Sequence, residues 1–529
     1  MTAILQVTVQ DNGVSAALSV PSQNVQFKCG IAIGGTVNQP YATTSPVSLQ
    51  TQFTGGPLVE SGGLVCKTGN VCVAMSVPVV TKGAAAAVVA GFSNVGNAAM
   101  TVVVDSTYGA WDQFYVKVKC VVPGTIGTAP GPSIIVSGDA GRNWGNPISL
   151  GSATTVDLGA PLNTVAVGGT GLRLSFTSAQ TMSVGDTWQF GTTPPLWNDA
   201  GLTAAFAAFQ ASQYGVAGVG SMHVVGPCAS GDVGSIQTAV QAGVASFQFD
   251  RCIVELRDQG GTTGISGGTT WGGSTETEAT WISALTTALA GTTAPRVCAD
   301  GGYYNIPSPY ANAAFGQPVY RRPLAWAHAA KRTTIPLQRR AGRVKDGPYG
   351  TGPEPAILVN PATDPTDGFV YHDERVTPGL AAGRVASAWT VPLKGQGFFQ
   401  GGSAPSGNNG GEPLLSAAGS QFTELVIGNA LDAACDIAAA FGIQEVSDDL
   451  LLQPNGTLNA ADQQQLQQGL QQALNAGLVA VGAVSSVTGT IVTSNVQATG
   501  AIPITVAVQP RGYVNTVSET ISIAYGGAQ

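Results

Sequence analysis

The side chains best suited to chemistry in this 529-residue chain are three neighbours, His372, Asp373 and Glu374. An imidazole beside two carboxylates could serve acid–base catalysis or bind a metal ion. Adjacent residues of an extended segment point to opposite faces, however, so the three would form a poor chelate. We therefore favour an ion-pair turn, made by Asp373, Glu374 and Arg375 at a domain or subunit contact.

A second candidate is the segment 137–144, which fits the pattern S-x-D-x-G-x-x-W. The pattern resembles the Asp-box of sialidase propellers, where it is structural and usually repeats; one copy is present here. Ser and Asp side chains bond the backbone of such a turn, and Gly141 accepts a conformation that other residues avoid. The prediction is a stiff β-hairpin in which Asp139→Asn would still accept the turn bonds. A glycosidase also needs paired acids, and these cannot be located in the sequence.

No segment predicts a cofactor or a catalytic nucleophile. A G-x-S-x-G elbow, a P-loop, an H-E-x-x-H pair and a G-x-G-x-x-G loop are all missing from any strand–helix context. The three histidines are far apart, and the eight cysteines are scattered without a C-x-x-C pair, so no metal site is expected. Buried free thiols fit a protein made in a reducing cytoplasm. We expect neither enzymatic activity nor cofactors.

Residues 320–345 hold eight of the chain's 22 basic residues. Clustered arginines can neutralise nucleic-acid phosphates, but the formal net charge of −8 and the lack of a binding motif argue against nucleic acid as a partner. We expect part of the segment to face an acidic protein surface, with a solvated loop as the alternative. The basic residues are Arg321, Arg322, Lys331, Arg332, Arg339, Arg340, Arg343 and Lys345.

Charge is scarce along the whole chain. Charged residues make up 10% of it, against about 25% in a typical globular protein, while 44% of the residues are hydrophobic. A weakly charged surface favours association, so we expect this chain to cover its surface with other copies of itself. Polar residues interrupt the apolar stretches 83–104 and 473–508, and the first residues lack a basic n-region. Neither a membrane span nor a signal peptide is therefore expected.

The predicted fold is multi-domain and of the α/β plus all-β class. Strands alternating with helices indicate a mixed α/β core domain, and short strands separated by Gly and Pro indicate an inserted β-sandwich-like module, with extended strands at both termini. Leu466, Leu470, Leu474 and Leu478 recur every four residues and predict one stripe of a helix packed on the chain's own core. The predicted segments are an amino-terminal arm (1–20), a β-rich segment (21–95), the all-β module (96–195), an α/β domain (196–365), a carboxy-terminal domain (366–500) and a strand arm (501–529).

Both ends of the chain alternate apolar and polar residues and have no hairpin partner nearby in sequence. Such segments can add as strands to the sheet of a neighbouring subunit. The residues that we expect at these contacts are Ile4, Val7 and Val9 at one end and Ile521, Ile523 and Tyr525 at the other.

Three short sequence strings lie at intervals along the last third of the chain. His372-Asp373-Glu374-Arg375 leads to Gly395-Gln396-Gly397-Phe398-Phe399; Gly419-Ser420-Gln421-Phe422 follows, and then Pro510-Arg511-Gly512-Tyr513-Val514. Their order resembles the carboxy-terminal domain of contractile phage-tail sheath proteins, which has a D-E-R turn, a strand ending in G-x-G-[YF]-[YF], a G-S-D-F helix start and a P-x-G-Y-[IV] strand. Gln421 stands where that family has Asp. The resemblance covers residues 366–525.

The resemblance implies a structural subunit of a contractile tail sheath, which assembles helically around an inner tube and contracts to drive the tube through the host envelope. The implied partners are other copies of the chain, the inner tail tube protein, and the baseplate and tail terminator proteins, with neither nucleic acid nor membrane among them. The implied location is the tail of the virion, after assembly in the host cytoplasm. Two alternatives stay open: a tail-spike or other carbohydrate-active β protein, suggested by the single Asp-box, and another virion structural protein.

Overall fold

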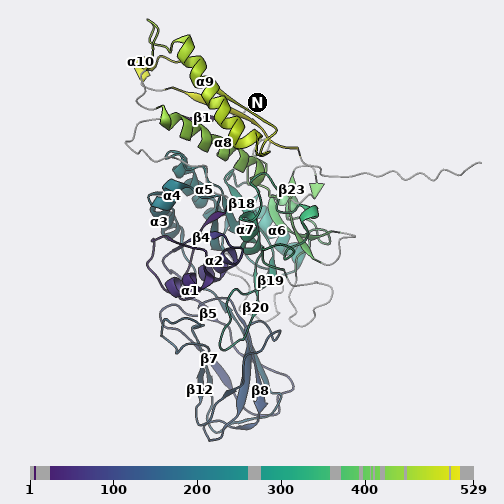
Figure 1. Cartoon of the computed structure of the whole chain (residues 1–529). Helices are drawn as coiled ribbons and strands as arrows, with labels where there is room; N and C mark the ends of the chain where they lie inside the picture. Colours follow the sequence, from purple (N-terminus) through teal and green to yellow (C-terminus); the bar gives the residue numbers. More distant parts are fainter. Residues whose placement is uncertain are drawn as a thin grey trace, which may run out of the picture.

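The molecule is elongated, and its three parts follow one another along the long axis (Figure 1). The computed structural model describes residues 5–7, 24–259, 276–357, 371–391, 397–404, 407–408, 411–417, 423–445, 450–499 and 502–512. An all-β module lies at one end, an α/β core in the middle, and a unit of helices and a small sheet at the other end. The predicted class, α/β plus all-β in several domains, is confirmed.

An eight-stranded sheet in the order β22-β21-β18-β17-β16-β2-β4-β3 forms the centre of the core. The six inner strands are parallel, and the two edge strands are antiparallel to their neighbours. The parallel strands are buried on both faces, and most of them are rich in apolar residues. The strands are β2 (Val25–Gly30), β3 (Tyr41–Thr43), β4 (Val71–Ser76), β16 (Ser221–Pro227), β17 (Cys252–Glu255), β18 (Val297–Asp300), β21 (Val385–Thr390) and β22 (Phe398–Gly401).

Helices pack on both faces of this sheet. One face holds α3 (Asp199–Gln210), α5 (Ser230–Val244) and α6 (Glu278–Leu289), with the short α4 (Gln213–Ala217) after α3. The other face holds α1 (Pro46–Phe53), α2 (Pro57–Lys67) and α7 (Leu324–Arg332). Side-chain caps set several helix starts: Asn198 accepts the N–H of Gly201 at α3, and Thr277 accepts that of Thr280 at α6.

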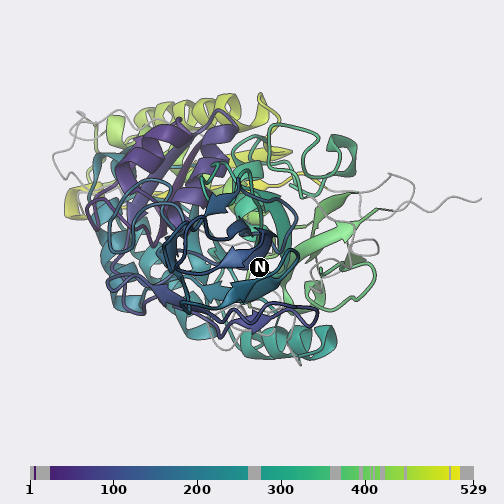
Figure 2. The ribbon, with the colours of Figure 1, turned by 90° about the horizontal axis from the view of Figure 1, so that it is seen from below.

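The all-β module leaves the core after β4 and returns to it at α3, and in the view from below it lies in front of the core (Figure 2). Its sheets are β11-β10-β8-β15-β5, to which β6 pairs through β15, and β12-β13-β7, with β14 paired to β9. The strands are β5 (Ala84–Ala85), β6 (Val89–Ala90), β7 (Met100–Val104), β8 (Tyr115–Val122), β9 (Gly124–Thr125), β10 (Ser133–Ser137), β11 (Ile148–Ser149), β12 (Thr155–Asp157), β13 (Leu172–Phe176), β14 (Thr181–Met182) and β15 (Thr187–Thr193). The predicted insertion is therefore present, and it begins at β5 rather than at residue 96.

A hairpin of the core, β19 (Tyr303–Pro307) and β20 (Val319–Pro323), reaches into the module. Phe315 and Tyr320 belong to the module's apolar cluster together with Phe114 and Trp188. The module and the core therefore share buried side chains across their junction. The remaining short elements of this region are η1 (Val344–Asp346), η2 (Ala381–Gly383), β23 (Ser403–Ala404) and β24 (Gly407–Asn408).

The carboxy-terminal unit combines helices with a three-stranded antiparallel sheet in the order β1-β26-β25. Its elements are α8 (Leu425–Gln444), α9 (Ala460–Leu474), the π-helical turn η3 (Asn475–Val479), β25 (Ser486–Ile491), α10 (Val496–Thr499), β26 (Ile504–Gln509) and the amino-terminal strand β1 (Leu5–Val7). The predicted leucine stripe is confirmed, because Leu466, Leu470, Leu474 and Leu478 are all buried in this unit's core.

The domain boundaries differ from those predicted. Strands from the segments 21–95, 196–365 and 366–500 all enter the one eight-stranded sheet, so the boundary at 365/366 does not separate two units. The physical reason is the parallel pairing of β18 with β21, a contact between residues 86 positions apart that leaves no local pattern in the sequence. The separate carboxy-terminal unit begins at α8 instead.

Helix α8 is apolar enough to cross a membrane, by length and composition alone. It spans 20 residues with a hydropathy of 1.5, and it passes that test alone among the helices of the described residues. In the folded chain, 67% of this window is buried, with Ala434, Ile437 and Ala438 in the core of the carboxy-terminal unit. The apolar face of α8 thus packs inside the protein.

Candidate functional site

The basic segment lies mostly inside the chain. Arg321, Arg322 and Arg340 are 5%, 2% and 8% exposed. Our expectation that these three arginines face another protein is therefore wrong. Because a buried cation without a partner is costly, each guanidinium lies against a carboxylate of the same chain. The side chains of Arg339 and Arg343 are 39% and 42% exposed, and these two keep the predicted surface position.

Arg322 joins three segments of the chain. Its guanidinium donates to Oε2 of Glu60 at 2.6 Å and to the carbonyl of Gln113 at 2.7 Å, and it lies 3.2 Å from Oδ2 of Asp112. Burial raises the pKa of Asp112 to about 7, against the opposing effect of Arg322. Glu60 is part of α2, Arg322 is part of β20, and Asp112 lies in the β module, shortly before β8. The cluster therefore fixes the β module to the core.

Two further arginines of the segment make similar links. Arg321 donates to both oxygens of Asp258, each at 2.7 Å, and its guanidinium lies 5.1 Å from the ring centroid of Tyr371. Arg340 donates through Nε to Glu424 at 2.8 Å, and Glu424 is the residue just before α8. These bidentate pairs hold the hairpin and the start of α8 in place.

Arginines outside the basic segment complete the connection to α8. Arg251 and Arg296 both bind Asp432, at 2.6 and 3.3 Å, and all three are buried. Asp432 lies on α8, whereas the arginines come just before β17 and β18. Sequence reasoning missed Asp432 and the other acidic partners, because single carboxylates scattered along the chain carry no periodic signal.

The trio Asp373, Glu374 and Arg375 forms a turn, but its two carboxylates are buried and bind N–H and hydroxyl groups of the described chain in place of the predicted ion pair with Arg375. The buried carboxylate of Glu374 accepts the three backbone N–H groups of residues 379–381 at 2.8, 3.2 and 3.1 Å. Asp373 accepts the Thr390 hydroxyl at 2.6 Å, and the exposed Arg375 donates to the same hydroxyl at 3.0 Å. The acidic side chains thus order the chain ahead of β21; a subunit contact through Arg375 stays a prediction.

His328 lies between two carboxylates. Its Nδ1 is 2.7 Å from Oδ2 of Asp300 and its Nε2 is 2.7 Å from Oε1 of Glu412, all three side chains being buried. Burial alone lowers the pKa of His328, but the two carboxylates outweigh it and raise the pKa to about 9. Cys298, Asp300 and His328 offer possible metal-ligand atoms within 4.8 Å of one another. Since both ring nitrogens face carboxylates, the geometry favours a buried imidazolium, which has no lone pair for a metal.

Like His328, His372 lies between two carboxylates. Its Nδ1 lies 2.9 Å from Oε1 of Glu278 on α6, and its Nε2 lies 2.9 Å from Oε2 of Glu374. Burial opposes the charge, but the two carboxylates raise the pKa of His372 overall. His372 thus links the D-E-R turn to α6, a structural task that explains its place beside two acids.

The Asp-box is a structural turn between the module and the core. Asp139 is 3% exposed, and Ser137 Oγ donates to its Oδ1 at 2.7 Å. The N–H of Asn143 also donates to Oδ1, at 2.9 Å, while Oδ2 accepts the side-chain amide of Asn143 at 2.7 Å and the N–H of Val319 at 3.0 Å. Four donors therefore converge on one carboxylate. In Asp139→Asn, one of the two acceptor oxygens would become an amide NH₂ that faces a donor, so we expect Asn to keep only part of these bonds.

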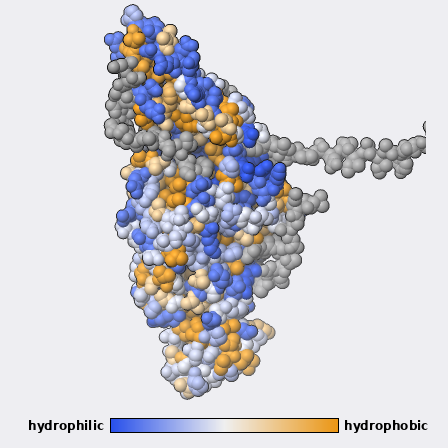
Figure 3. Space-filling view, in the orientation of Figure 1, coloured by the Kyte–Doolittle hydropathy of each residue, from blue (hydrophilic) through white to orange (hydrophobic). Residues whose placement is uncertain are grey.

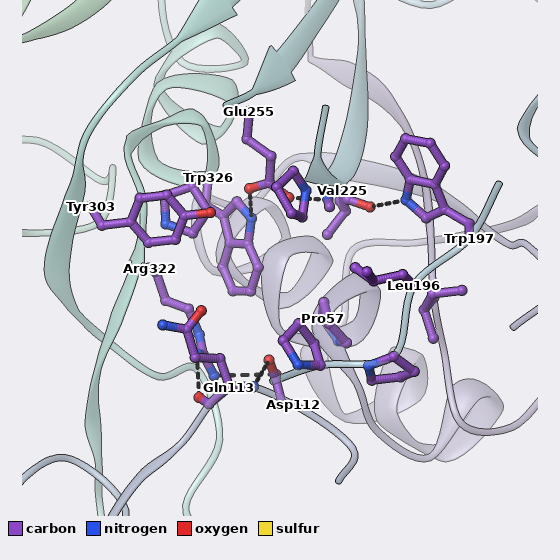
Figure 4. A pocket seen from close by; sticks show the side chains of 16 residues that line it. Pro57, Asp112, Gln113, Leu196, Trp197, Val225, Glu255, Tyr303, Arg322 and Trp326 are labelled. Atoms are coloured by element: carbon purple, nitrogen blue, oxygen red, sulfur yellow. Dashed lines mark hydrogen bonds and ion pairs between the residues drawn. The ribbon is translucent and has the colours of Figure 1, made fainter. Parts of the chain in front are cut away.

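A pocket lies where doubly wound folds bind ligands, at the carboxyl ends of β16 and β17, beside the point where strand order reverses between β2 and β16 (Figure 4). The chain's own indoles occupy this place. Trp197 donates to the carbonyl of Val225 at 2.9 Å, and Trp326 donates to Glu255 at 2.8 Å. Burial raises the pKa of Glu255 to about 8. The crevice is thus lined by Trp197, from the segment that returns from the β module, and by Trp326 of α7.

The terminal strands meet at the small sheet. Val7 pairs with Ile504 and Leu5 with Val506, so that β1 lies antiparallel on β26 of the same chain. The other predicted contact residues, Ile4, Val9, Ile521, Ile523 and Tyr525, lie outside the described residues. The second string of the family resemblance, residues 419–422, also lies outside them. Pairing between subunits stays a prediction.

Comparisons with known proteins give distant structural similarity. No protein-family model matches the chain, and no curated protein matches it. The solved structure of a sheath tail protein from Listeria innocua aligns over 93% of this chain and 93% of its own, with 9% identity and a TM-score of 0.41. One from Desulfitobacterium hafniense aligns over 91% of this chain and 93% of its own, with 11% identity and a TM-score of 0.40.

Proposed function

We propose that this chain is the subunit of a contractile tail sheath, which assembles helically around an inner tube, contracts, and drives the tube through a host envelope. The observation that carries the proposal is the small sheet β1-β26-β25, in which an amino-terminal strand adds to a carboxy-terminal hairpin. A strand held by main-chain hydrogen bonds can come from another copy as well as from its own chain. A head-to-tail contact of this kind that does not close builds a helical tube.

The surface supports association. Of the chain's 22 basic and 30 acidic residues, 23 are buried in the part that the structure describes, so the surface is even poorer in charge than the sequence. Exposed apolar side chains, shown in orange in Figure 3, gather on the β module and on the carboxy-terminal unit. Phe92 of the module is 109% exposed, and Leu451 of the carboxy-terminal unit is 64% exposed. Contact with other subunits or with an inner tube would cover these side chains.

The partners belong to the same proposal: further copies of the chain, the inner tube protein, and baseplate and terminator proteins. The virion tail is the proposed location, with assembly in the host cytoplasm. No catalytic step is included. The carboxylates of Asp139, Asp373 and Glu374 are bonded to N–H and hydroxyl groups of their own chain, which suits a structural role.

Strand exchange can be tested with the double variant Gln6→Cys, Thr505→Cys, because these two positions are register partners of β1 and β26. The native cysteines are all buried, so they do not compete. In purified, assembled protein we expect oxidation to give a ladder of disulfide-linked multimers and electron micrographs to show striated tubes. Monomers with an internal disulfide, together with discrete particles in place of tubes, would contradict the proposal and favour a spike.

A further inference from the structure

Strand β25 forms one edge of the small sheet, yet its outward backbone groups are bonded. The backbone groups of Val487, Gly489 and Ile491 alternate with those that pair with β26, so they point to the open side. An edge of this kind normally offers free N–H and C=O groups to any passing strand. Here helix α9 lies along it, and side chains of the helix take up those groups.

Glutamines supply the bonds. Gln471 donates to the carbonyl of Val487 at 2.9 Å and accepts the N–H of Gly489 at 3.1 Å. One helical turn earlier, Gln467 donates to the carbonyl of Gly489 and accepts the N–H of Ile491 at 2.7 Å.

A third glutamine of α9, Gln463, donates to the carbonyl of Ile491 at 3.4 Å and to the hydroxyl of Thr493 at 3.1 Å. Gln467 and Gln471 thus repeat one pattern, and Gln463 extends it. Each primary amide offers one acceptor and a donor group, as a backbone peptide does.

The two spacings match. Four residues of a helix advance by about 6 Å, and two residues of an antiparallel strand advance by about 6.8 Å. Glutamines at every fourth position of α9 can therefore meet every second residue of β25. Close approach is possible because position 489 is glycine: a Cβ there would lie 2.7 Å from side-chain atoms of Leu470 and Leu474. The row of amides takes the place of a neighbouring strand.

We propose that Gln463, Gln467 and Gln471 close the β25 edge to strand pairing, so that the sheet takes up strands of a second copy only at its β26 edge. The β26 edge is the one on which β1 lies. Closure on one side gives the sheet a single direction of growth, and it keeps β25 edges of two copies from pairing with each other. The reference to a second copy rests on the proposed function, whereas the closure itself does not.

The matched control lies on the same helix. Gln464, Gln468 and Gln472 have the same spacing but are exposed. The full-length triple variants Gln463→Ala/Gln467→Ala/Gln471→Ala and Gln464→Ala/Gln468→Ala/Gln472→Ala therefore change helix propensity equally and differ in the edge bonds. We expect amide hydrogen exchange at Gly489 and Ile491 to become about tenfold faster or more in the first variant and to stay unchanged in the second.

Pairing between the β25 edges of two copies is measured by adding Thr488→Cys to each chain. Thr488 is an exposed position in the middle of β25. Two β25 edges that pair antiparallel would bring these thiols together. We expect disulfide dimers in the first triple variant and none above background in the native or control chains. Equal exchange in both triples, or faster exchange without dimers, would overturn the proposal.

Two further measures distinguish a variant that fails to fold, or a chain that forms no tubes, from an error in the proposed closure of β25. If the first triple variant does not fold, Gln467→Ala is compared with Gln468→Ala by the same exchange measurement. Exchange and cross-linking are measured on unassembled chains, so a chain that forms no tubes would count against the proposed function and leave the closure of β25 to be judged on its own.

Discussion

Arg322 and Glu60 form a buried ion pair of 2.6 Å across 262 residues of sequence. The pair joins the β19–β20 hairpin to helix α2, and Asp112 of the β module lies against the same guanidinium. Much of the basic segment therefore holds the parts of one chain together. The proposed contraction would need such links if each chain is to move as a rigid body.

Removing Arg322 tests this role. Arg322→Met leaves Glu60 and Asp112 buried without their cation, so we expect the free energy of unfolding to fall by about 3–5 kcal/mol. Urea unfolding followed by tryptophan fluorescence measures the loss. Arg343→Met is the control, because its half-exposed pair with Asp346 should contribute about 0–1 kcal/mol. Equal effects of the two substitutions would contradict the assignment.

The half-exposed arginines test the remaining surface prediction. Neutralising Arg339 and Arg343 together should leave the fold intact and weaken assembly, because the side chains of both arginines are accessible to a partner. Light scattering during assembly at several salt concentrations checks this, since screening should reduce the difference between native chain and variant if a charged partner is involved. Arg340→Ala should instead lower stability, as it leaves Glu424 buried and unpaired. Assembly of the Arg339/Arg343 variant at the native rate at every salt concentration would refute the surface contact.

His328 predicts a pH dependence of stability. Its pKa is raised to about 9 in the folded chain, above its usual 6.5. The stabilisation is therefore complete below pH 6.5 and lost as the pH rises through 9, with a total of up to about 3 kcal/mol. We expect the stability difference between the native chain and His328→Gln to shrink over this range. Thermal or urea unfolding at pH 6, 7.5 and 9 gives the comparison; a constant difference would show that His328 does not carry the charge.

Substitutions of Asp139 should lower the stability of the folded chain by amounts that depend on how many hydrogen bonds the new side chain can accept. Asp139→Asn turns one acceptor oxygen into a donor facing other donors, so we expect a cost of about 1–3 kcal/mol, and Asp139→Leu should cost more. Asp157→Asn is the control, because its ion pair with Arg173 is partly exposed. No turnover of sialosides or other glycans is expected from any of these chains. A glycosidase activity abolished by Asp139→Asn in a folded chain would favour the spike alternative.

Local patterns in the sequence determined the elements of this protein. The leucine repeat of α9, the turn-separated strands of the β module and the strand–helix alternation of the core all depend on residues close together in the chain, and each is present. Each carboxy-terminal string is likewise local, and the order of the strings along residues 366–525 carries the resemblance to sheath proteins. Periodicity and turn chemistry act over a few residues, so a single sequence displays them.

Only the tertiary structure decided which charges are internal. An arginine on β20 has the same sequence signature whether it meets solvent, another subunit or Glu60, because its partner is brought near by the packing of distant strands. The same holds for the parallel pairing of β18 with β21, and for Gln467, which is one of many glutamines until α9 lies beside β25. Long-range pairing depends on the burial of whole faces of helices and sheets. The sequence pattern shows which face of an element is apolar, but it does not show which other element packs against that face.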